Sequence, residues 1–115
     1  MGSFKEIESD IKQEVICICG DSGSGKTQKA SEYKEKYKDA VILDGDAILK
    51  YVNSDLGYSL LDRYKNNQVI SRIAEMLYYQ GHKVIISTVR ADIAFEILTK
   101  DDIPCKLIKL SPKRE

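Results

Sequence analysis

Residues 20–27 read GDSGSGKT and follow the apolar run EVICIC at 14–19. The stretch fits the pattern G-x-x-x-x-G-K-[ST], whose glycines let the backbone approach a ligand and turn its N–H groups inward as an anion-binding nest. EVICIC predicts a strand, and TQKASEYKEKY at 27–37 predicts a helix whose positive end adds to the nest. A Gly/Ser-rich surface turn is the alternative, but both flanks favour a phosphate-binding loop.

Every residue of this loop is a predicted nucleotide contact. Lys26 can reach the outer phosphates as a point charge, which gives it a catalytic role as well, and the Thr27 hydroxyl can ligate Mg²⁺. The loop therefore predicts a bound nucleotide, ATP or GTP, together with Mg²⁺. The predicted nucleotide-binding residues are Gly20, Asp21, Ser22, Gly23, Ser24, Gly25, Lys26 and Thr27.

Strands and helices alternate along the rest of the chain. Further strands are predicted at 40–43, 83–87 and 106–110, and further helices at 46–52, 60–80 and 91–100, with Gly81 ending the long helix. This α/β alternation predicts a parallel sheet with helices on both faces. Ligands of such sheets bind at the carboxyl ends of the strands, where GDSGSGKT, DGD and STVR all fall. Residues 1–12 are expected to be a loose lead-in or one helical turn.

The composition fits one cytoplasmic domain over residues 1–115. Lys plus Arg and Asp plus Glu are 18 each, so no overall field attracts long nucleic acid or a membrane. We expect neither a membrane span nor a signal peptide. Cys17, Cys19 and Cys105 are expected to be packed, reduced thiols, since no His or second pair supports a C-x-C metal site. His82, after Gly81, is expected in a loop.

Two carboxylates follow the second strand in VILDGD. On an extended chain Asp44 and Asp46 face the same side, so both are expected to point beyond the phosphate loop. Phosphoryl transfer needs only a carboxylate that orients the acceptor hydroxyl, and we assign this catalytic role, with Mg²⁺ binding, to Asp46. Asp44 is expected on the acceptor side, assisting with Mg²⁺ or holding the turn. The alternative is a plain turn in which Asp46 caps the next helix.

Three stretches together resemble the adenylylsulfate kinase family, which transfers a phosphoryl group from MgATP to the 3′-hydroxyl of adenosine 5′-phosphosulfate. They are GDSGSGKT, LDGD at 43–46 and NSDLGYSLLDRYKNN at 53–67; the last follows the family pattern D-L-G-[FY]-S-x-x-D-R-x-x-N. The resemblance covers about residues 14–110. It implies a three-layer α/β/α P-loop NTPase fold with a small, mainly parallel sheet of about four strands in the order 2-3-1-4.

The resemblance also implies an acceptor site. Tyr58 would stack on the acceptor's adenine, Arg63 would pair with its phosphosulfate, and Asn66 would hydrogen-bond nearby, which suits an aromatic face, a planar cation and an amide. Without the family pattern, Tyr58 reads as a core tyrosine, and Arg63 with Asp62 as an exposed ion pair at a helix start.

The chain departs from the family pattern at several places. The family has D-G-D-N-x-R, whereas Ala47 and Leu49 stand at the Asn and Arg positions. Loss of that charged acceptor contact is expected to cost about 1.5–3 kcal/mol of acceptor binding. Arg90 in STVRAD is the predicted remnant of another acceptor contact. The family continues beyond this chain with an Arg-bearing lid and another strand, so we expect an open sheet edge that favours a homodimer.

These observations predict a small-molecule kinase that acts on adenosine 5′-phosphosulfate or a related acceptor. One alternative is a kinase for a nucleoside or a polynucleotide end, although the neutral charge disfavours long nucleic acid. Another is a nucleotide-binding module without transfer activity.

Overall fold

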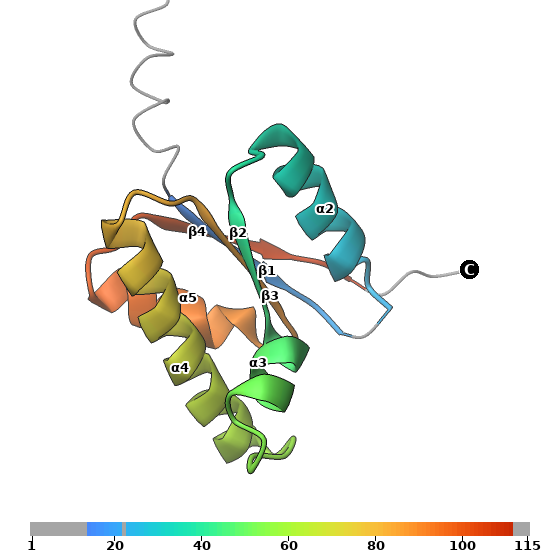
Figure 1. Ribbon diagram of the computed structural model, residues 1–115. Coiled ribbons are helices and arrows are strands. Elements are labelled where there is room, and N and C mark those ends of the chain that lie inside the picture. Colours follow the sequence, from blue (N-terminus) through green and yellow to red (C-terminus); the bar gives the residue numbers. More distant parts are fainter. Residues whose placement is uncertain (1–13, 22, 112–115) are drawn as a thin grey trace, which may run out of the picture.

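The computed structural model describes residues 14–21 and 23–111, so the predictions for residues 1–12 and for Ser22 lie outside the described residues. Four strands form one parallel sheet in the order β2-β3-β1-β4, which confirms the predicted order (Figure 1). Val15 of β1 lies opposite both Val84 of β3 and Cys105 of β4. The strands are β1 (Val15–Cys19), β2 (Val41–Asp44), β3 (Val84–Thr88) and β4 (Cys105–Lys109).

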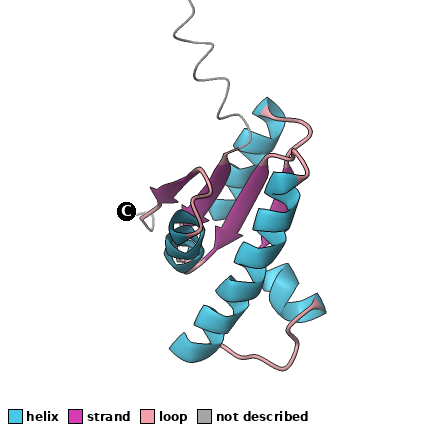
Figure 2. Cartoon of the chain, turned by 90° about the vertical axis from the view of Figure 1, so that its left-hand side faces the viewer, coloured by secondary structure: helices cyan, strands magenta, loops and turns pink. Residues whose placement is uncertain are grey.

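Helices cover both faces of this sheet. One face is covered by α2 (Lys26–Lys36), and the other by α4 (Leu60–Tyr79) and α5 (Ala91–Lys100) (Figures 1 and 2). The short α3 (Gly45–Tyr51) begins at the end of β2 and lies beside α4. The three-layer α/β/α arrangement is the predicted fold.

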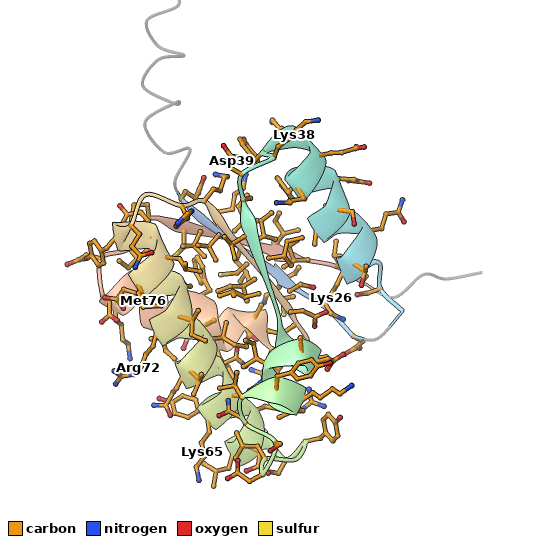
Figure 3. The ribbon with its side chains drawn as sticks, viewed as in Figure 1. Lys26, Lys38, Asp39, Lys65, Arg72 and Met76 are labelled. Carbon is orange, nitrogen blue, oxygen red and sulfur yellow. The ribbon has the colours of Figure 1, made fainter. Side chains whose placement is uncertain are left out.

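Alternate residues of β1 face opposite layers. Ile16 and Ile18 pack with Ala30 beneath α2, whereas Val15 and Cys17 pack against α4 and α5 (Figure 3 shows the filled space between the layers). Because both faces of the strand are covered, its sequence is a continuous apolar run instead of an alternating one. This rigid central strand leads directly into the phosphate loop.

The long α4 ends as predicted. Gly81 has a left-handed φ of 93°, and the N–H groups of Gly81 and His82 donate to the carbonyls of Tyr78 and Leu77 at 2.9 and 3.0 Å. These two hydrogen bonds form the Schellman motif, which favours glycine because a Cβ strains the left-handed backbone. His82 lies in the connection between α4 and β3, as expected.

The three cysteines are free thiols. Burial raises the pKa of Cys17 far above its ordinary value, as expected of a packed thiol. Within the described residues no helix is long and apolar enough to cross a membrane.

Candidate functional site

A cavity of about 780 Å³ lies at the carboxyl ends of β2 and β3, between the starts of α2, α3 and α4. It brings together residues from all three predicted stretches and from the end of β3. Each predicted acceptor-side residue lines it, as do Lys26 and Thr27. The predicted residues on its wall are Gly23, Gly25, Lys26, Thr27, Asp44, Asp46, Tyr58, Arg63, Asn66 and Arg90.

The phosphate loop has the backbone that its sequence demands. Gly23 and Gly25 have left-handed φ angles of 85° and 96°, which glycine adopts without strain. Gly25 is also the N-cap of α2 and has no side chain to occupy the first N–H groups of the helix, which suits an anion. The Lys26 ammonium donates to the carbonyl of Asp21 at 3.2 Å, at the loop end of α2 (Figure 3).

Three loop residues lie beside the main cavity instead of lining it. Gly20 is buried, and a Cβ there would meet the Ser24 hydroxyl and come within 3.1 Å of the Leu110 carbonyl. The Ser24 Oγ is itself buried and has no hydrogen-bond partner among the described residues. Gly20 and Asp21 line a neighbouring cavity of about 290 Å³. The loop residues that line the main cavity are therefore Gly23, Gly25, Lys26 and Thr27.

The turn after β2 differs from the prediction. We expected Asp44 and Asp46 on one extended segment, but β2 ends at Asp44 and α3 begins at Gly45, so Asp46 is helical. Asp44 caps this helix, since its Oδ1 accepts from the Asp46 N–H at 2.9 Å. The alternative prediction, a plain turn in which Asp46 caps the next helix, is also wrong, because the cap is Asp44. Both carboxylates still line the cavity, one from the strand end and one from the first turn of α3.

Tyr58 and Arg63 contact each other on the wall of the cavity. The Tyr58 side chain is 69% exposed, which excludes a core tyrosine. The Arg63 Nε donates to the Tyr58 carbonyl at 2.9 Å, and its Cζ lies 5.7 Å from the ring centroid. Asp62 accepts from the Gly57 N–H at 2.8 Å and makes no ion pair with Arg63, so the predicted alternative was wrong. The bonds of Arg63 and Asp62 instead shape the loop before α4.

Two neighbouring asparagines of α4 line the cavity. Asn66 is 6% exposed; its Oδ1 accepts from Asn53 at 2.8 Å and its Nδ2 donates to the Gly45 carbonyl at 3.3 Å. Asn67 was missed by the sequence reasoning. Its Nδ2 donates to the Arg63 carbonyl at 2.9 Å, while its Oδ1 is buried without a partner in the described chain. The sequence signal that could have placed Asn67 near the site is its position one helical turn after Arg63.

The family model of adenylylsulphate kinase matches residues 12–94. The chain belongs to the adenylylsulphate kinase family. It is 34% identical over 79 residues to the adenylyl-sulfate kinase of Paraburkholderia xenovorans, covering 65% of this chain and 44% of that protein. It is 38% identical over 88 residues to the probable adenylyl-sulfate kinase of Bacillus subtilis, covering 70% and 45%. The chain thus spans less than half the length of these two curated relatives.

A solved structure supports the same assignment. The Mycobacterium tuberculosis APS kinase CysC, in complex with AMPPNP and APS, superposes with a TM-score of 0.77 at 27% identity. The match covers 85% of this chain and 62% of that one. The comparisons therefore give both the family and the fold of this chain.

Arg90 lines the main cavity while it is bound to Asp92. Its Nε and Nη2 donate to the two Asp92 oxygens at 2.9 and 2.8 Å, and these hydrogen bonds lower the pKa of Asp92 below its ordinary value. This bidentate pair neutralises much of the charge that Arg90 would offer to a bound anion. Leu49 also lines the cavity, so this chain departs from the family pattern at a position that faces the site.

The oxygen donors fit a magnesium ion. The Thr27 hydroxyl and the carboxylates of Asp44 and Asp46 belong to residues of the same wall, and these hard oxygen ligands suit Mg²⁺. In 14–21 and 23–111 no three His, Cys, Asp or Glu side chains come together as a metal site. A few protein oxygens are enough for Mg²⁺, because it usually keeps several waters and binds substrate phosphates.

Proposed function

We propose that this protein binds MgATP on residues 20–27 and transfers the γ-phosphoryl group to a hydroxyl of a small acceptor, with adenosine 5′-phosphosulfate as the first candidate. The observation that carries the proposal is one cavity of about 780 Å³ shared by the phosphate loop, the DGD turn and the Tyr58–Arg63 pair. Donor phosphates and acceptor hydroxyl can thus meet within a single enclosure, which is the main requirement of phosphoryl transfer.

Most of the predicted residues have a role in this proposal. The loop N–H groups and Lys26 hold the phosphates, and Asp46 accepts a hydrogen bond from the acceptor hydroxyl and orients it toward the γ-phosphorus. A strong base is unnecessary because the transition state is loose. Tyr58 offers an exposed ring face to a base, and Arg63 offers a planar cation to an oxyanion. Mg²⁺, held by Thr27 and Asp46, would neutralise charge on the transferring phosphates.

Leu49 favours a second candidate within the same chemistry. Its apolar side chain faces the acceptor side, and Arg90 is already paired with Asp92, so Arg63 is the acceptor-side cation without a carboxylate partner among the described residues. An acceptor with less negative charge than a phosphosulfate, such as a nucleoside, suits this wall better. A cytoplasmic location, which fits the three free thiols, completes the proposal.

The test is γ-phosphoryl transfer from labelled ATP with Mg²⁺, comparing adenosine 5′-phosphosulfate, adenosine and no acceptor. We expect label to enter the acceptor only when one is present, and Asp46→Asn to lower the rate by about 10²-fold or more. Arg63→Ala should raise the acceptor KM. Label released as phosphate without acceptor would indicate a hydrolase, and ATP binding without turnover would leave a binding module. Full activity of Asp46→Asn would remove the proposed role of that residue.

A further inference from the structure

One buried side chain, Asn66 of α4, bonds to both ends of α3. Its Nδ2 donates to the carbonyl of Gly45, the first residue of α3, at 3.3 Å. Its Oδ1 accepts from the Nδ2 of Asn53, two residues beyond the helix end, at 2.8 Å. A seven-residue helix is thus held at its start and just past its end by a single amide.

The direction of these bonds is fixed by chemistry. The Gly45 carbonyl can only accept, so the Asn66 amide must present its N–H₂ group there and its oxygen to Asn53. Asn53 must then present its own N–H₂ group. Its backbone is also anchored, because its N–H donates to the Ile48 carbonyl and its carbonyl accepts from the Leu56 N–H, both at 3.0 Å. The pair Asn53–Asn66 therefore has one arrangement.

The turn at Gly45 also has little room to move toward β3. A Cβ at Gly45 would collide with the Thr88 side chain at the end of β3, so the backbone there is already in contact with that strand. Asn66 holds the same residue from the side of α4. The Asp44 cap then fixes the Asp46 N–H relative to β2 at 2.9 Å. The backbone position of Asp46, from which its exposed side chain extends, follows from these three constraints.

We infer that Asn53 and Asn66 are positioning residues, which set the distance from Asp46 to the phosphate loop and to Arg63 without touching the reacting atoms. Asn53 does not line the main cavity; it lines a separate cavity of about 300 Å³ together with residues of α4 such as Gln68. Its effect on phosphoryl transfer must therefore pass through Asn66 and α3. The inference rests on the proposed function, and it gives Asn66 a positioning role in addition to the predicted acceptor contact.

Kinetics of Asn53 variants test this role. We expect Asn53→Ala to lower kcat about tenfold to a hundredfold, because a displacement of about 1 Å can cost that much, while the KM for acceptor and the affinity for ATP change little. Asn53→Asp keeps the side-chain size without the N–H donors and should behave alike. The double variant Asn53→Ala/Asn66→Ala should be no slower than Asn66→Ala, since the two residues act as one unit.

The matched control is Gln68→Ala. Gln68 is an exposed residue that lines the same smaller cavity as Asn53. Its side-chain amide makes no hydrogen bond within the described chain, so its removal should leave kcat unchanged. An Asn53→Ala protein with wild-type kcat, beside an Asn66→Ala protein with a raised acceptor KM, would overturn the inference. In that case Asn66 serves as an acceptor contact alone.

A second measurement separates this inference from the proposed function. Hydrogen exchange over residues 45–53 should be faster in Asn53→Ala and Asn53→Asp than in the wild type or Gln68→Ala, whether or not any acceptor is phosphorylated. Wild-type protein without transfer activity would refute the proposed function alone. Unchanged exchange in both Asn53 variants would refute the positioning role, even in an active kinase.

Discussion

Gly45, between Asp44 and Asp46, has no room for a larger side chain. A Cβ at this position would collide with the Cβ and Oγ1 of Thr88. Gly45→Ala should therefore lower the free energy of unfolding by about 1–3 kcal/mol, even though alanine favours helices. Gly57→Ala is the matched control, because its Cβ would meet only the Asp62 Oδ2 at 3.4 Å. Denaturant unfolding of both variants decides the matter, and equal stabilities would contradict this reading of Gly45.

The Arg90–Asp92 pair gives the protein a pH dependence. Its hydrogen bonds lower the pKa of Asp92, so the pair stabilises the fold above the ordinary pKa of about 3.9, and this stabilisation is lost as pH falls through the lowered pKa. The side chains are 40% and 28% exposed, so Asp92→Asn should cost no more than about 1 kcal/mol at neutral pH. The difference from wild type should shrink below about pH 4. The measurement is the unfolding free energy from pH 7 to 3 of three proteins: wild type, Asp92→Asn and the exposed control Glu35→Gln. A difference between wild type and Asp92→Asn that does not change with pH would contradict the role given to this ion pair.

At the level of single helices, α4 and α5 end in the same motif with different residues. Gly81 follows α4 with a φ of 93°, and Asp102 follows α5 with a φ of 62°. In each, the next N–H donates back to the helix at 3.0 Å, from His82 to Leu77 and from Ile103 to Leu98. Gly81→Ala should cost about 1–2 kcal/mol of unfolding free energy, since it places a Cβ in the left-handed region.

The reverse substitution, Asp102→Gly, should stabilise the protein by up to about 1 kcal/mol, because it relieves the same strain at α5. The gain is limited by the greater freedom of glycine in the unfolded chain. Thermal unfolding of the two variants should move Tm in opposite directions. A lower Tm for Asp102→Gly would mean that its side chain stabilises the end of α5 more than its backbone strains it.

Helices and strands were predictable from sequence because their signals are local. The apolar run EVICIC, the helical spacing of 60–80 and the stop at Gly81 gave boundaries within about two residues, since both periodicity and capping act over one or two turns. The helix cap at Asp44 was not predicted, because an aspartate can extend a strand or cap a helix with the same local sequence. The roles of Asn53 and Asn67 depend on contacts between elements, which no spacing rule contains. The signal that brought Tyr58 and Arg63 into the site was the family pattern, not generic physics.

At the scale of the whole molecule, the sheet of the described residues has two edge strands, β2 and β4. β4 pairs only with β1 there, and its Lys106 and Lys109 side chains are exposed, which disfavours uncontrolled pairing of strands. The predicted homodimer through this edge stays a prediction. The measured mass in solution at several concentrations would test it, with Lys106→Ile expected to increase any association.

Nucleotide binding should stabilise the entire fold, because the phosphate loop joins β1, the central strand of the sheet, to α2. A ligand that binds only the folded state at 100 times its Kd adds about 2.7 kcal/mol, so saturating MgATP should raise Tm by on the order of 10 °C. Lys26→Ala should remove most of this shift. Lys29→Ala is the matched control, since Lys29 lies on the same helix, bonds to Glu32 at 3.4 Å and does not line the cavity. A Tm that MgATP leaves unchanged in the wild type would show that the loop does not bind this nucleotide. An equal shift in wild type and Lys26→Ala would instead place the binding elsewhere.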